Sequence, residues 1–117
     1  MHIHYISEQN SILNHFLAQI RDVNIQNDSM RFRKNIERIG EIMAYELSKT
    51  LDYKEIDVQT PLGIKHTTTI AEPVVLCSIL RAGLALHQGF MSFFDNAENG
   101  FVSAYRHHYD NDDKFER

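Results

Sequence analysis

The chain is poor in the residues that mark secreted, membrane-spanning or disordered proteins. Its 117 residues include one cysteine, two prolines, five glycines and no tryptophan. The single cysteine, Cys77, cannot form an internal disulfide, which indicates a reducing compartment, and we expect the protein to be cytoplasmic. No apolar run approaches the roughly 20 residues that cross a bilayer, and the first residues lack the features of a signal peptide. We therefore expect no membrane partner.

Positive charge is also scarce. Lysine and arginine number 12 against 16 aspartates and glutamates, which gives a formal net charge of −4. Nucleic-acid-binding domains usually carry a net positive charge, so this balance predicts no nucleic-acid partner. The hydrophobic share of 43% and the charged share of 24% are those of an ordinary globular protein. The length suits one domain and is short for two.

Hydrophobic periodicity predicts a helical arm over residues 1–50. Apolar residues recur at helical spacing over about 11–21, and after a polar break the same spacing returns and continues to about Lys49. Short polar side chains precede both periodic stretches and are candidate N-caps: Asn10 or Ser11 for the first helix, and Asp28 or Ser29 for the second.

Strand signals follow the helical arm. Residues 51–70 predict a β-hairpin, because 56–60 alternates like a strand, 61–63 supplies turn residues and 64–69 can return. Residues 71–106 predict a βαβ unit, in which a strand at 74–77 and a strand at 101–105 flank a helix. The run 74–77 is continuously apolar, which is typical of a strand buried on both faces, and Cys77 within it is expected to be a small core residue.

Two arginines follow the two strands of the predicted βαβ unit. Arg81 comes after the first strand and Arg106 directly after the second. Parallel strands joined by a right-handed crossover end at the same edge of the sheet, where ligands of such sheets bind. Two guanidinium groups there form a plausible phosphate clamp, and Ala82 and Gly83 let a ligand approach the backbone at a helix start. The alternative is that both arginines are ordinary surface residues.

Other candidate residues have simpler interpretations. The acidic stretch 107–117 is a solvated loop rather than a metal site, because its histidines and aspartates match no known ligand spacing. His87 is expected to be a surface or packing residue of its helix. Arg31 and Arg33 could meet a nucleotide effector or a partner, and solvated positions in the first helical turn are the alternative.

The sequence resembles the uracil phosphoribosyltransferase family from about residue 9 to residue 109. The run SILRAGLALHQGF, followed by FVSAYR, closely resembles the ILRAG and later YR motifs of that family. Residues 30–33, with Tyr45 and Glu46, are similar to its N-terminal helix, and residues 56–61 resemble its strand ending in Thr-Pro. The order of these pieces makes the resemblance specific.

The resemblance implies an α/β fold: a partial doubly wound parallel sheet of the type I phosphoribosyltransferase kind, with an N-terminal helical arm and a β-hairpin. It implies transfer of a phosphoribosyl group from phosphoribosyl diphosphate to uracil, giving UMP and diphosphate in pyrimidine salvage, with Mg²⁺ accompanying the diphosphate. It places Arg81, Ala82, Gly83 and Arg106 in the phosphoribosyl diphosphate site. It also implies a non-proline cis peptide at or beside Leu80–Arg81.

The resemblance further implies that residues 1–117 correspond to the N-terminal portion of a single phosphoribosyltransferase domain. Members of the family continue with a Thr-Gly-Gly type loop for the ribose 5-phosphate and with segments that bind uracil, and neither occurs here. We expect these residues alone to be inactive. We also expect a homodimer or higher homo-oligomer, because half a parallel sheet leaves apolar surface uncovered. The alternative is a non-catalytic truncated homologue that oligomerises or binds phosphorylated ligands.

Overall fold

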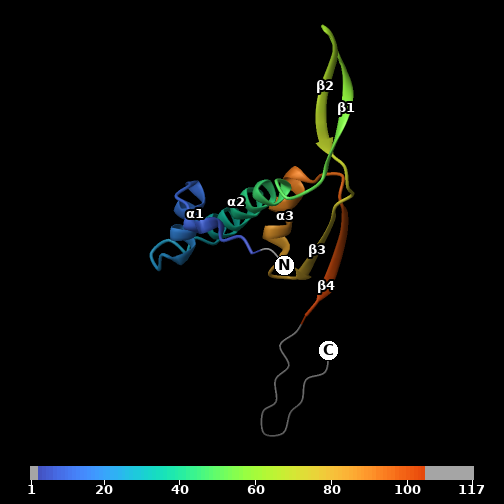
Figure 1. The fold of residues 1–117 in the computed structure, drawn as a ribbon. Coiled ribbons are helices and arrows are strands. Elements are labelled where there is room, and N and C mark those ends of the chain that lie inside the picture. The colour runs from blue at the N-terminus through green and yellow to red at the C-terminus, as the bar shows by residue number, and fades with distance from the viewer. Residues whose placement is uncertain (1–2, 105–117) are drawn as a thin grey trace.

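A computed structural model describes residues 3–104 (Figure 1). This part of the chain combines α-helices with two separate two-stranded sheets, in agreement with the expected α/β class. No helix within 3–104 is long and apolar enough to cross a membrane. In chain order the elements are a short 3₁₀ helix (Ile6–Glu8), α1 (Ile12–Arg21), α2 (Ser29–Ser48), β1 (Tyr53–Thr60), β2 (Gly63–Ile70), β3 (Val75–Leu80), α3 (Leu84–Phe93) and β4 (Glu98–Ser103).

Side-chain caps begin α1 and α2 at predicted residues. The Ser11 hydroxyl accepts a hydrogen bond from the Leu13 N–H at 3.2 Å, and the Asp28 carboxylate accepts one from the Arg31 N–H at 3.1 Å. Each cap satisfies a backbone donor that the first helical turn leaves unpaired. The predicted bounds of both helices are therefore confirmed to within about one residue.

A buried polar residue of α2 helps to hold the arm together. Leu13 of α1 is 3% exposed, and Asn35 of α2 is fully buried. The Asn35 amide donates to the Gln19 side-chain oxygen at 2.7 Å and accepts from Arg38 at 3.0 Å. These bonds satisfy the buried amide and tie α1 to α2.

The predicted hairpin is confirmed. Strands β1 and β2 pair antiparallel from Tyr53 opposite Ile70 to Thr60 opposite Gly63. Gly63 closes the turn with φ of +136°, a conformation that side-chain-bearing residues rarely adopt. The hairpin extends away from the helices (Figure 1), and nearly all of its side chains are exposed.

The predicted βαβ unit is also confirmed. Strands β3 and β4 pair in parallel, from Val75 opposite Glu98 to Leu80 opposite Ser103, and α3 forms the connection. Strand β4 begins three residues before the predicted start at Phe101. The two strands therefore run in the same direction and end at the same edge.

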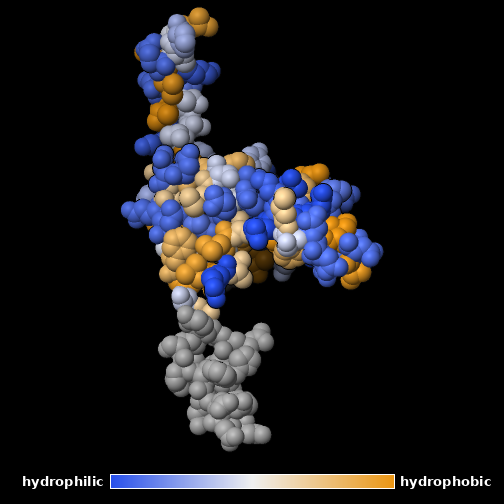
Figure 2. Space-filling model, turned by 180° about the vertical axis from the view of Figure 1, so that it is seen from behind, coloured by the Kyte–Doolittle hydropathy of each residue, from blue (hydrophilic) through white to orange (hydrophobic). Residues whose placement is uncertain are grey.

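Burial of β3 on both faces was wrongly predicted. Leu76 and Ser78 are buried at 9% and 6% exposure, whereas Val75 and Ile79 are 63% and 60% exposed. Cys77 lies on the exposed face and is not a core residue. The physical reason is that helices cover one face only: Leu76 packs with Ala44 of α2 and with Phe94. Figure 2 shows apolar surface gathered over the region of β3 and β4.

Helices α2 and α3 cross with their backbones in contact. A Cβ atom on Gly40 would lie 2.6 Å from the Leu86 carbonyl oxygen, and one on Gly89 would lie 2.2 Å from the Glu37 carbonyl oxygen. Real Cβ atoms essentially never approach backbone atoms so closely. The crossing therefore requires glycine on both helices and fixes where α3 lies on α2.

We predict that Gly89→Ala destabilises the protein strongly. The added methyl group meets rigid backbone, so we expect a loss of about 2–3 kcal/mol in the free energy of unfolding, measured by urea denaturation. Gly100→Ala is the matched control, because a Cβ there would meet only Cys77 Sγ at 3.9 Å and the Leu76 oxygen at 4.0 Å. Equal stability of the two variants would contradict the close crossing.

Candidate functional site

The turn between β3 and α3 is a compact, backbone-bonded structure. The Leu80–Arg81 peptide bond is cis, as the family resemblance implied. The Gly83 N–H donates to the Ile79 carbonyl at 3.0 Å, and the Leu84 N–H donates to the Arg81 carbonyl at 3.2 Å. Residues 81–83 are thereby folded back over the end of their own strand.

Gly83 is required by packing within this turn. A Cβ atom there would lie 2.6 Å from both the Ile79 carbonyl oxygen and the Ser78 hydroxyl oxygen. The strand itself therefore excludes a side chain at position 83, independently of any ligand. That a ligand also approaches Ala82 and Gly83 closely stays a prediction.

The start of α3 presents backbone donors. No side chain caps the helix at Gly83. Within residues 3–104, the N–H groups of Ala82, Ala85 and Leu86 donate to no backbone carbonyl. Free donors and the positive end of the helix dipole at one place favour an anion.

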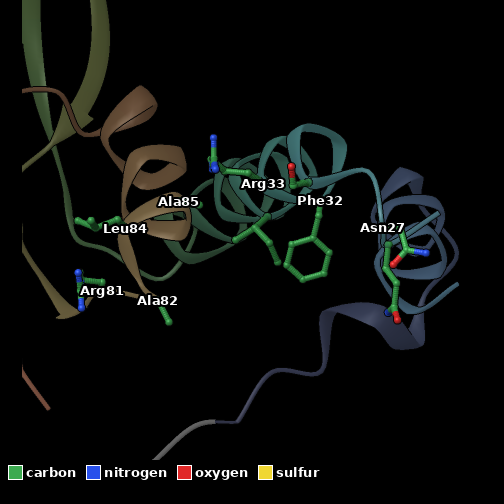
Figure 3. A pocket seen from close by; sticks show the side chains of 10 residues that line it. Asn27, Phe32, Arg33, Arg81, Ala82, Leu84 and Ala85 are labelled. Atoms are coloured by element: carbon green, nitrogen blue, oxygen red, sulfur yellow. The ribbon is translucent and has the colours of Figure 1, made fainter. Parts of the chain in front are cut away.

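A cleft of about 750 Å³ separates this turn from the start of α2 (Figure 3). Arg81 and Ala82 border it from the turn, and Phe32 and Arg33 border it from α2. Its full lining is Gln26, Asn27, Ser29, Phe32, Arg33, Ile36, Arg81, Ala82, Leu84 and Ala85. The structure thus brings two segments about fifty residues apart to one opening.

Arg33 and Arg81 are the two arginines on this cleft. Both are exposed, and neither forms an ion pair with any residue of 3–104. Arg31, in contrast, lies 3.7 Å from the Asp28 carboxylate and does not line the cleft. Sequence reasoning noted Arg33 but did not place it opposite Arg81, because no local spacing signals a contact between the two segments.

Arg106, the second arginine of the predicted clamp, lies outside the described residues. Strand β4 is described to Ser103, which pairs with Leu80 directly before Arg81. The chain therefore leaves the sheet at the edge where Arg81 lies. The convergence of Arg81 and Arg106 stays a prediction.

The parallel βαβ unit and the arginine turn at its edge define an α/β fold of the phosphoribosyltransferase type. Among solved structures, the chain is similar to the AQ2163 protein from Aquifex aeolicus, with a TM-score of 0.65 and 29% sequence identity. That similarity covers 80% of this chain and 44% of the other.

The family is shown by sequence. Residues 6–115 match the family described as "UPRTase: Uracil phosphoribosyltransferase", and the chain belongs to this family. It is 50% identical over 110 residues to a protein named uracil phosphoribosyltransferase from Porphyromonas gingivalis, covering 94% of this chain and 51% of that protein. A protein of the same name from Sulfolobus acidocaldarius is 42% identical over 98 residues, or 81% of this chain and 44% of that protein. The chain spans about half the length of these curated relatives.

Proposed function

We propose that this protein transfers the phosphoribosyl group of phosphoribosyl diphosphate to N1 of uracil, giving UMP and diphosphate. The bond between C1′ of the ribose and the diphosphate oxygen breaks, a bond from C1′ to N1 forms, and the N1 proton is released. Membership of the uracil phosphoribosyltransferase family supports the reaction. The observation that carries it is the β3–α3 turn at the edge of a parallel sheet, which presents backbone donors and an arginine that pairs with no acidic side chain of residues 3–104.

In this proposal, residues 3–104 supply the diphosphate side of the site. Negative charge grows on the departing diphosphate while the ribose becomes oxocarbenium-like. Fixed donors beside the leaving group therefore stabilise the transition state more than the ground state. Arg81 offers a planar fork that bonds two phosphate oxygens together, Ala82 and Gly83 offer the turn backbone, and Arg106 is the proposed second fork.

Magnesium enters the proposal as part of the substrate. Within the described part of the chain, no three His, Cys, Asp or Glu side chains come together to hold a metal ion. Mg²⁺ is commonly bound through substrate phosphates and one or two carboxylates rather than by an all-protein cage. Bound to the diphosphate, it would neutralise charge on the leaving group.

A homo-oligomer is the proposed assembly. A hairpin of two strands is marginally stable by itself in water, yet β1 and β2 extend from the body with their side chains exposed. Apolar side chains on β3 and β4 are also exposed: Val75, Ile79, Phe101 and Val102. Packing of a second copy would bury the exposed side chains of the hairpin and these apolar side chains of the sheet. The same features support the alternative, a non-catalytic homologue that oligomerises or binds phosphorylated ligands.

We predict that the 117-residue chain is a dimer or larger at micromolar concentration in light scattering. Deleting residues 55–68 and joining Lys54 to Thr69 through two glycines tests the hairpin, because the base of the hairpin stays closed by the Ala71 N–H bond to the Asp52 carbonyl at 2.8 Å. The deletion should shift the protein toward monomer. A monodisperse 13.7 kDa monomer before deletion would contradict the assembly.

We predict that residues 1–117 alone form no UMP from uracil, phosphoribosyl diphosphate and Mg²⁺. Reaction requires sugar phosphate, diphosphate and base to be held together, because orientation supplies much of the rate. A chimera that joins these residues to the C-terminal half of the Porphyromonas gingivalis relative should form UMP. Turnover by the 117-residue chain at a rate comparable to the chimera would show that the site is complete without those further segments.

We predict that Arg81→Ala in the active chimera lowers kcat/KM for phosphoribosyl diphosphate by about 100-fold or more. Arg81→Lys should restore little, because a lysine ammonium lacks the two-point fork. Arg21→Ala is the matched control, since Arg21 is an exposed arginine at the end of α1 and does not line the cleft. If Arg81→Ala behaves like Arg21→Ala in this assay, Arg81 has no place in the site.

A further inference from the structure

His87 connects the β3–α3 turn to the second strand of the parallel sheet. It lies on α3 and is only 7% exposed, so of the two expected roles the structure supports packing rather than surface. Its Nε2 atom lies 2.8 Å from Oδ1 of Asn99 on β4. Its ring also packs at a tilt on Phe101, with ring centroids 5.0 Å apart. The side chain of His87 is therefore held by β4.

The hydrogen-bond network defines the direction of the histidine bond. The Asn99 side-chain nitrogen donates to the Ala97 carbonyl at 3.3 Å, which leaves its Oδ1 facing the ring. An amide oxygen can only accept, so this hydrogen bond requires a proton on His87 Nε2. A buried donor that loses its acceptor carries a desolvation cost. The His87 side chain is therefore restrained to the position in which its Nε2–H meets Asn99.

The backbone of the same residue holds the turn. The His87 N–H donates to the Gly83 carbonyl at 2.9 Å. Gly83 in turn lies against Ser78 and Ile79 of β3 with no space for a Cβ atom. One residue thus joins the turn through its main chain and β4 through its side chain.

An aliphatic side chain could fill the space that the His87 ring occupies between α3 and β4. Burying the imidazole of His87 costs more than burying an aliphatic side chain of similar size, and only a correctly aligned hydrogen bond offsets the difference. What the pair of His87 and Asn99 adds is a fixed position of α3 along β4. Arg106 follows β4 three residues beyond its last described pair with β3.

We propose that His87, acting with Asn99, is a positioning residue for the Arg81–Gly83 turn. Its bond fixes the start of α3 relative to β4, and so fixes Arg81 relative to the second strand of the parallel sheet. The proposal rests on the proposed function only for what the turn binds, because the positioning itself is a property of the 117-residue chain.

Amide hydrogen exchange of the 117-residue chain, followed by NMR, tests the positioning. The readout is exchange at Gly83 and Leu84, whose N–H groups are bonded within the turn. His87→Leu and Asn99→Ala should each speed this exchange about tenfold, and the double variant no more than either alone. His87→Gln keeps a side-chain N–H donor and should exchange nearly as the original chain does.

A control variant and the pattern of exchange across the chain decide between positioning and general stability. His15→Leu removes an exposed histidine of α1 and should leave exchange at Gly83 and Leu84 unchanged. Asn99 is exposed, so Asn99→Ala keeps the test open if His87→Leu does not fold. Unchanged exchange in Asn99→Ala, additive effects in the double variant, or faster exchange throughout α1 and the hairpin would each overturn the proposal.

Two further measurements separate this proposal from the proposed function. The ¹⁵N spectrum of the His87 ring should show the Nε2–H tautomer, and an Nδ1–H tautomer would overturn the assigned bond. Calorimetric titration of the original chain with diphosphate and Mg²⁺ tests the ligand. Absence of binding would count against the proposed ligand, while the exchange result would still decide the positioning role.

Discussion

The close crossing of α2 and α3 is the constraint on which the candidate site depends. Gly40 and Gly89 let the two backbones touch, and the nearest neighbours of Gly89 are all backbone atoms of α2 that cannot move aside. Helix α3 is therefore fixed on α2, and the turn that begins α3 is fixed with it. The cleft between that turn and Phe32 and Arg33 of α2 exists because of this contact. A change in the crossing would alter the site without touching an arginine.

Local signals were sufficient for the elements of the fold but not for their burial. Ser11 and Asp28 marked the helix starts because capping is a local interaction, and the turn at 61–63 marked the hairpin for the same reason. The apolar run at 74–77 correctly indicated a parallel strand. Its second face is exposed because burial depends on what covers a strand, and helices cover only the side of Leu76 and Ser78.

The candidate site was also predictable only in part. Arg81 could be placed at the sheet edge because strand direction and crossover hand determine that position. Arg33 on the opposite wall of the cleft and the bond from His87 to Asn99 could not be predicted. Both depend on tertiary contacts between different elements, and no periodic pattern in the sequence indicates such contacts. In the sequence, His87 is an ordinary residue of a helix. Its bond to Asn99 exists only because β4 packs beside α3.

Rigidity explains why such contacts matter as much as the charge of Arg81. An exposed guanidinium facing water gains little from a single phosphate, because solvent screens the pair and the long side chain loses freedom. Useful affinity and transition-state stabilisation require several donors held in one geometry before the ligand arrives. In this chain the turn hydrogen bonds, the packing of Gly83 on β3 and the bond from His87 to β4 supply that fixed geometry. In the proposed function, the role of the arginine therefore depends on residues that need not touch a ligand.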